Sequence, residues 1–204
     1  MDLKIHWEHI HQTKTPTQVS WYQEHALQSL QFIVDTGVDN TGQIIDIGGG
    51  ISTLVDDLVA NGYQRISVLD ISAAALHTTQ QRLGAQAREI TWIEADVTQA
   101  QLPYQFYDVW HDRAVFHFLT QAADRQHYIE TVRDAVRPGG HIIVATFASD
   151  GPDHCSGLEV LRYSPESLHN EFGDDFQLVS TSRETHHTPF GTDQKFIYCY
   201  CRMK

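Results

Sequence analysis

The stretch IIDIGGGIS, residues 44–52, changes within a few positions from a stiff segment to the most flexible one in the chain. Its apolar, β-branched residues are typical of a buried strand. The three glycines that follow allow a sharp backbone turn. The next residues, ISTLVDDLVANG, carry apolar side chains at helical spacing and stop at Gly62. The stretch therefore predicts a strand, a glycine-rich turn and a helix.

Strand-like and helix-like segments alternate beyond this turn. ISVLDI predicts the next strand and SAAALHTTQQRLGA the next helix, with Ser72 as its N-cap. EITWIEAD and YDVWHD are strand-like, a helix is expected from about Ala122 to Val136, and RPGG predicts a turn before the buried strand HIIVATF. This order predicts an α/β fold with a mostly parallel sheet and helices on both faces. FQLVSTSRE and QKFIYCYC predict a hairpin that closes one edge of the sheet.

The length and composition predict one globular domain over residues 1–204. Within it we expect an N-terminal arm and helix (1–40) and a candidate substrate loop (148–165). Hydrophobic residues are 41% and charged residues 20% of the chain, which is typical of a globular protein. The N-terminus MDLKIHWEHI lacks a basic region followed by an apolar one, and no apolar run approaches the roughly 20 residues of a membrane span. We therefore expect a cytoplasmic protein without a membrane partner.

The net charge, the cysteines and the histidines argue against nucleic acid as a partner, against disulfides and against a bound metal. Lys and Arg number 14 against 26 Asp and Glu, a net charge of −12, which disfavours nucleic acid as a partner. The sparse cysteines Cys155, Cys199 and Cys201 predict reduced thiols, the last two packed on one strand face. None of the 13 histidines has the spacing of a recognised zinc motif, so we expect no metal.

Two carboxylates follow the glycine-rich turn at the ends of successive strands. Ligands of open α/β sheets bind beyond the carboxyl ends of the strands. Asp70, twenty residues after Gly50, can accept both hydroxyl protons of a ribose, although it can also serve as a helix N-cap in competition with Ser72. Asp96 can accept a bond from an adenine amino group. A tight turn without a ligand is the plain alternative for the glycines.

The ordered segments IIDIGGGIS, VLDIS, IEADV, YDVWHDRAVFHFL and VRPGGHIIVATF resemble the motifs of class I S-adenosylmethionine-dependent methyltransferases. The resemblance covers the chain from about Trp21 to the C-terminus. It implies a seven-stranded, Rossmann-like sheet that is mostly parallel, with an antiparallel terminal strand and helices on both faces. It also implies S-adenosyl-L-methionine as cofactor.

The resemblance further implies which residues bind that cofactor. The residues so implied lie near the methionine part (Asp46, Gly48, Gly49 and Gly50), the ribose (Asp70) and the adenine (Ile71, Asp96 and Val97), with Trp21 as a cover. A nicotinamide site is the alternative, but the spacing departs from G-x-G-x-x-G at Ser52 and Thr53. No P-loop ending follows the glycines, so nucleoside triphosphate chemistry is not expected.

The candidate catalytic residues follow the fourth predicted strand. They are His111, Asp112, Arg113 and His117. A histidine can take up a proton near neutral pH, which is needed only if the acceptor arrives protonated. The plain alternatives are that His117 packs beneath a helix and that Asp112 and Arg113 form an ion pair that shapes the loop.

The candidate substrate-binding residues are Tyr22, Cys155 and Arg162. Tyr22 and Trp21 either fold over the cofactor or anchor the arm to the core. Cys155 could contact a soft atom, and Arg162 could pair with a substrate carboxylate. A surface connection stiffened by turns is the alternative for the loop.

Three functions are consistent with these features. The leading one is methyl transfer to a small-molecule acceptor. The second is protein-lysine methylation, because Asp112-Arg113-Ala114 resembles the DKG-type sequences of elongation-factor lysine methyltransferases and an acidic surface suits a basic partner. The third is a regulatory protein that binds the cofactor without catalysis. The acceptor atom is not fixed by this fold.

Overall fold

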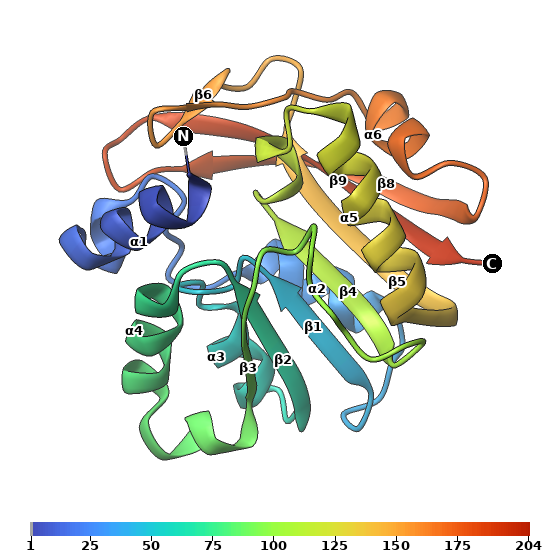
Figure 1. Ribbon diagram of the computed structural model, residues 1–204, viewed down its shortest axis with the longest axis horizontal. Helices are drawn as coiled ribbons and strands as arrows, with labels where there is room; N and C mark the ends of the chain where they lie inside the picture. The colour runs from blue at the N-terminus through green and yellow to red at the C-terminus, as the bar shows by residue number, and fades with distance from the viewer. Residues whose placement is uncertain (1) are drawn as a thin grey trace.

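The computed structural model describes residues 2–204 and contains a seven-stranded sheet in the order β3-β2-β1-β4-β5-β9-β8 (Figure 1). The strands are β1 (Gln43–Ile47), β2 (Arg65–Asp70), β3 (Thr91–Glu94), β4 (Tyr107–Arg113), β5 (Val136–Phe147), β8 (Phe176–His187) and β9 (Asp193–Met203). The first five pair in parallel. The last strand, β9, is antiparallel to both β5 and β8. This confirms the mostly parallel seven-stranded sheet and the terminal hairpin.

The RPGG segment differs from the expectation, because it lies within β5 and not before it. Val136 pairs with Tyr107, whereas the next pair in the ladder joins His141 to Val109. Residues 137–140 therefore bulge out of the ladder between these two pairs. Gly139 has φ +77° there, a conformation that glycine adopts readily.

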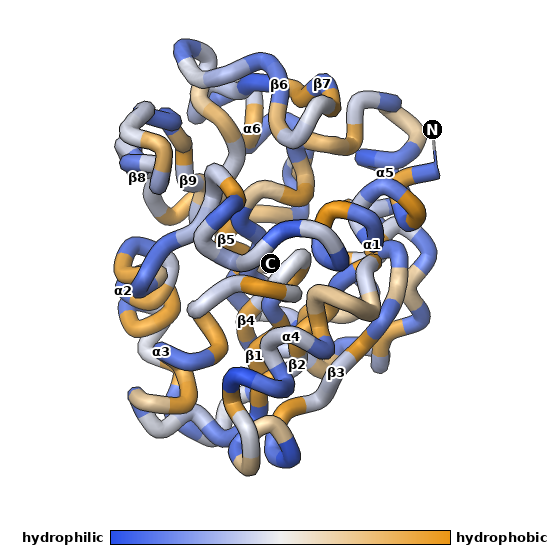
Figure 2. Tube along the Cα trace, turned by 90° about the vertical axis from the view of Figure 1, so that its left-hand side faces the viewer, coloured by the Kyte–Doolittle hydropathy of each residue, from blue (hydrophilic) through white to orange (hydrophobic). Residues whose placement is uncertain are grey.

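Helices cover both faces of the sheet. They are α1 (Leu3–Thr13), α2 (Leu27–Asp35), α3 (Leu54–Ala60), α4 (Ala73–Leu83), α5 (Ala122–Ala135) and α6 (Pro165–Phe172), with the short 3-10 helices η1 (Pro16–Gln18), η2 (Gly84–Glu89) and η3 (Phe116–Phe118). Val132 of α5 and Leu168 of α6 belong to one hydrophobic core. Ile33 of α2, Leu54 of α3 and Leu76 of α4 belong to the other. In Figure 2 apolar and polar colours alternate along α2 and α3, as expected for helices with one face on a sheet.

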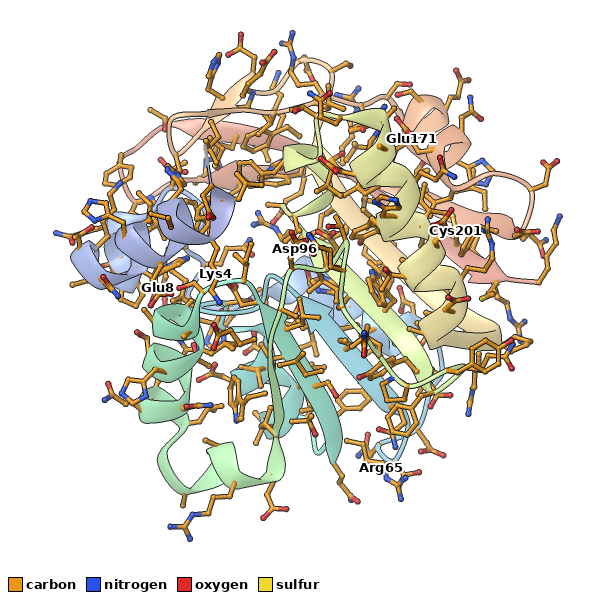
Figure 3. The ribbon with its side chains drawn as sticks, viewed as in Figure 1. Lys4, Glu8, Arg65, Asp96, Glu171 and Cys201 are labelled. Carbon is orange, nitrogen blue, oxygen red and sulfur yellow. The ribbon has the colours of Figure 1, made fainter. Side chains whose placement is uncertain are left out.

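The N-terminal arm contains a helix, α1, that packs beside α4 (Figure 1). None of its residues is buried. The Lys4 ammonium donates to Glu94 over 2.6 Å, and Glu8 accepts a 2.7 Å bond from the Ser72 hydroxyl. Figure 3 shows both side chains on the side of α1 that faces α4. These two polar contacts join α1 to the end of β3 and to the N-cap of α4. The helix therefore lies above the carboxyl ends of the strands.

The candidate substrate loop folds into a short hairpin of β6 (His154–Cys155) and β7 (Leu158–Glu159). Cys199 and Cys201 are both buried in β9, and their Sγ atoms lie 3.5 Å apart as free thiols. Across residues 2–204, no helix is both long and apolar enough to cross a membrane.

Candidate active site

A cavity of about 200 Å³ opens at the carboxyl ends of the central strands. The predicted site residues that line it are Trp21, Gly48, Asp70, Ile71, Asp96, Val97, Arg113 and Cys155. They come from the N-terminal segment, the ends of β1 and β2, the segment after β3, the end of β4 and the β6–β7 hairpin. Figure 3 shows Asp96 at the centre of the molecule, beside this opening. The fold therefore brings most of the predicted cofactor residues to one space.

The backbone N–H groups of the glycine-rich turn already have partners. Those of Gly48 and Gly49 donate to the Leu69 carbonyl over 2.7 Å and 3.3 Å. That of Gly50 donates to Asp70 Oδ2 over 2.9 Å. A phosphate cradle requires free N–H groups, so this turn does not form one. A Cβ on Gly50 would overlap the Asp70 carboxylate, which is why glycine is needed there.

Asp70 is buried, with 7% of its surface exposed, and it lines the cavity. Its Oδ1 accepts from the Ser72 N–H over 2.8 Å. Ser72 itself caps α4, because its hydroxyl accepts from the Ala75 N–H. Burial raises the pKa of Asp70 from its ordinary value to about 6. Each carboxylate oxygen has a second lone pair, so Asp70 can still accept bonds from a ligand.

Asp46 and His111 line a second, smaller cavity of about 40 Å³. His111 Nδ1 lies 2.7 Å from Asp46 Oδ1. Within the described part of the chain, Asp46 Oδ2 and His111 Nε2 have no hydrogen-bond partner although both are buried. A buried carboxylate oxygen without a donor is costly, and it suits a ligand that brings a positive N–H group.

Asp96, Ile71 and Val97 form the part of the larger cavity next to β3. Asp96 Oδ1 accepts from the Thr98 N–H and hydroxyl over 2.9 Å and 2.8 Å. Its Oδ2 accepts no bond from residues 2–204. Ile71 and Val97 add apolar walls. This combination of apolar walls and a free acceptor suits a heteroaromatic ring with an amino group.

Arg113 lines both cavities, but it does not pair with Asp112, so that alternative from the sequence is wrong. Its Nη2 lies 3.1 Å from Glu184 Oε2, and its Nε donates to the Tyr198 hydroxyl over 3.2 Å. The guanidinium also lies 4.0 Å from the centre of the Phe196 ring. The charge of Arg113 is therefore neutralised within the protein.

Asp112 lines neither cavity and is fully buried. It accepts from the N–H groups of Val115 and Phe116 over 2.8 Å and 3.1 Å, and from the Tyr128 hydroxyl over 2.7 Å. Burial raises its pKa to about 6. These contacts make Asp112 a residue that fixes the turn after β4.

Two other predicted residues lie away from both cavities. His117 is fully buried, and its Nδ1 accepts from the Phe147 N–H over 3.3 Å. Burial lowers the pKa of His117 to about 3, so the imidazole is neutral and packs inside the protein. Arg162 is exposed and donates to the Gly151 carbonyl over 3.3 Å. The geometry supports neither a proton-transfer role for His117 nor a substrate contact for Arg162.

The remaining substrate-side candidates divide between the two cavities. Cys155 lines the larger one, and burial raises the pKa of its thiol to about 11. It is therefore a neutral, weakly reactive wall residue. Tyr22 lines only the smaller cavity, whereas Trp21 lines both. The role of Trp21 as a cover over the cofactor stays a prediction.

Several cavity residues were missed by the sequence analysis: Leu3, Trp7, His11, Phe118 and Asp124. The first three are spaced four residues apart and share one face of α1. That spacing was a readable signal, because it predicts a helix with one apolar face. Phe118 and Asp124 carry no comparable signal, since they belong to a short 3-10 helix and to the first turn of α5.

Comparison with known proteins finds relatives of this chain. Residues 45–142 match a family described as a methyltransferase domain. The chain is 26% identical over 108 residues to the eEF1A lysine and N-terminal methyltransferase of Mus musculus, and 23% identical over 133 residues to the EEF1A lysine methyltransferase 2 of Danio rerio. The matches cover 53% and 62% of this chain, but it spans only 15% and 57% of those relatives.

Solved structures share the fold over the whole chain. A methyltransferase from Anabaena variabilis superposes with a TM-score of 0.78 at 15% identity, covering 100% of this chain and 96% of that one. The 1,6-didemethyltoxoflavin-N1-methyltransferase of Burkholderia thailandensis, solved with its substrate and S-adenosylhomocysteine, gives a TM-score of 0.70 at 15% identity, covering 99% and 87%. The fold is thus that of Rossmann-like methyltransferases.

Proposed function

We propose that this chain, whose residues 45–142 match a family described as a methyltransferase domain, is a class I S-adenosylmethionine-dependent methyltransferase that transfers a methyl group to a small-molecule acceptor. The observation that carries the proposal is a row of three carboxylates, Asp46, Asp70 and Asp96, from three adjacent strand ends. Each keeps hydrogen-bonding capacity for a ligand. They border a glycine turn that offers no phosphate cradle.

These residues fit the parts of S-adenosylmethionine. The unpartnered Asp46 Oδ2 suits the methionine ammonium, Asp70 suits the ribose hydroxyls, and Asp96 suits the adenine amino group. Ile71 and Val97 would hold the adenine ring, with Trp21 above the site. The bound cofactor supplies a methyl group activated by a sulfonium. The protein's task is to align the acceptor about 3–3.5 Å from that carbon, which can supply on the order of 7–11 kcal/mol.

A small acceptor is favoured by the position of α1 at the site. Leu3, Trp7 and His11 of this helix line the cavity beside Trp21, so α1 covers part of the space that a second substrate would enter. The toxoflavin enzyme, whose acceptor is a small molecule, is similar over nearly this whole chain.

Protein-lysine methylation is the second candidate. It is favoured by the two relatives named for lysine methylation and by the net charge of −12. The backbone adds a third indication. Ala114 has φ +76°, a conformation that favours glycine, at the position where DKG-type sequences carry that residue.

Methyl transfer from tritiated S-adenosylmethionine separates the candidates. Purified protein is incubated with either the low-molecular-mass fraction or the protein fraction of a cell lysate. The proposal predicts label in the small-molecule fraction, and label confined to protein bands would support the lysine alternative. An Asp70→Asn variant is the control for label that does not depend on this site.

A further inference from the structure

Three aromatic rings line the larger cavity and come from separate elements. Trp7 lies on α1, Trp21 precedes α2, and Phe118 ends η3. The Trp7 and Trp21 ring centres are 5.7 Å apart with their planes at 80°. Those of Trp7 and Phe118 are 5.1 Å apart at 75°. We call these three residues the aromatic corner. None is fully buried, so part of each ring remains available to a ligand.

The charges around the aromatic corner are predominantly negative. Asp96 and Asp124 both line the cavity, and the Asp124 carboxylate has no hydrogen bond or ion pair with any residue from 2 to 204. The only guanidinium on the described lining, that of Arg113, is paired with Glu184. Burial lowers the pKa of His11 to about 4, so this imidazole adds no positive charge at neutral pH. The lining of this cavity thus combines uncompensated negative charge with aromatic rings.

This combination selects among acceptor groups. A carboxylate or phosphate would meet like charges and the negative faces of the rings, without a free cation to receive it. An ammonium ion is attracted both by aromatic faces and by a carboxylate. The aromatic corner and Asp124 are therefore complementary to a cation.

We infer that the acceptor is an amine, received as its ammonium ion by Trp7, Trp21 and Phe118 with Asp124 as the counter-charge. The inference rests on the proposed methyltransferase function. The ammonium first loses one proton to water. The nitrogen lone pair then forms the bond to the methyl carbon while the sulfur–carbon bond breaks and leaves its electron pair on sulfur. The product is a methylated ammonium ion, and the cofactor becomes a neutral thioether. A free amine and a lysine side chain share this chemistry.

A binding experiment tests the inference without turnover. Protein saturated with S-adenosylhomocysteine is titrated calorimetrically with benzyltrimethylammonium and, separately, with phenylacetate, an anion of similar size. The cation is expected to bind and phenylacetate is not. Trp7→Leu should weaken cation binding about tenfold. Asp124→Asn should weaken it about threefold. Glu130→Gln, an exposed carboxylate on the same helix, should leave it unchanged.

The outcomes distinguish a failure of the proposed function from a failure of this inference alone. If S-adenosylhomocysteine itself does not bind, the proposed function fails and the inference fails with it. If the cofactor product binds but phenylacetate binds as tightly as the cation, or neither probe binds, the inference alone is overturned. Displacement of the cation by benzylamine favours a free amine, and displacement by an end-blocked Gly-Lys-Gly peptide favours a lysine side chain. Displacement by neither would also overturn the inference.

Discussion

Asp46 of β1 and His111 of β4 are direct neighbours across the parallel ladder, and a 2.7 Å hydrogen bond joins their side chains. Their side chains are 3% and 2% exposed. The bond occupies Asp46 Oδ1 and leaves Oδ2 without a partner among the described residues. His111 was expected to be catalytic; we propose instead that it is a positioning residue, which holds the Asp46 carboxylate with Oδ2 free for a ligand.

Replacing His111 tests this role. His111→Leu removes the donor and should weaken S-adenosylhomocysteine binding about tenfold, because a hydrogen bond to a charged group is worth about 1.5–3 kcal/mol. His111→Asn keeps an N–H at the position of Nδ1 and should retain most of the affinity. Calorimetric titration measures both. Equal losses in the two variants, each still folded by thermal unfolding, would contradict the positioning role.

The buried Asp112 should make stability depend on pH. Its pKa in the folded protein is about 6, above the ordinary 3.8, so the folded state binds more protons between these values. Stability from this group is present in acid and is lost as the pH rises through 6. Asp112→Asn should therefore lower the free energy of unfolding more at pH 4.5 than at pH 7.5.

Urea denaturation of both proteins at the two pH values checks this difference. The exposed Asp174, changed to Asn, reports effects of pH that do not arise from burial. A pH-independent difference between the wild type and Asp112→Asn would show that Asp112 is not desolvated as described.

Ala114 offers a site for stabilisation. It follows β4 with φ +76°, and a left-handed conformation costs a residue with a Cβ about 1–2 kcal/mol. Glycine removes that cost but gives the unfolded chain more entropy, about 0.4–1 kcal/mol. Ala114→Gly should therefore raise the free energy of unfolding by up to about 1.6 kcal/mol. Ala145→Gly, within β5, should lower it, and stabilisation by both changes would contradict the explanation.

The helix α1 should matter more for binding than for folding. It has no buried residue, yet Trp7 and His11 line the cavity. Deleting residues 2–14 should leave cooperative urea unfolding intact and weaken S-adenosylhomocysteine binding several-fold. An unchanged affinity would exclude α1 from the site, and loss of cooperative unfolding would show that the helix belongs to the core.

The sequence predicted the parts of the fold that depend on local patterns. The strand before Gly48, the Ser72 cap and the β8–β9 hairpin follow from apolar runs, a capping residue and a polar break. For residues 1–40 a helix was expected without bounds, and the helix α6 was missed because it is short and mostly polar. Ser164 and Pro165 were nevertheless available as an N-cap and a first helical residue for α6.

The candidate site was harder to predict, because contacts between distant residues decide it. Asp112 and His117 were expected to line the cavity because they lie near the end of a strand. In the folded chain both side chains are buried in the core. Arg113 finds its partner at Glu184, seventy-one residues away. The aromatic corner joins Trp7 to Phe118, and no local pattern indicates that contact.

Calorimetric titration of S-adenosylhomocysteine into the purified protein tests the central claim most directly. The account predicts saturable binding at one site per chain, weakened at least about tenfold in both Asp46→Asn and Asp70→Asn. Folded protein that binds neither S-adenosylhomocysteine nor S-adenosylmethionine would contradict it, as would unchanged affinity in both variants.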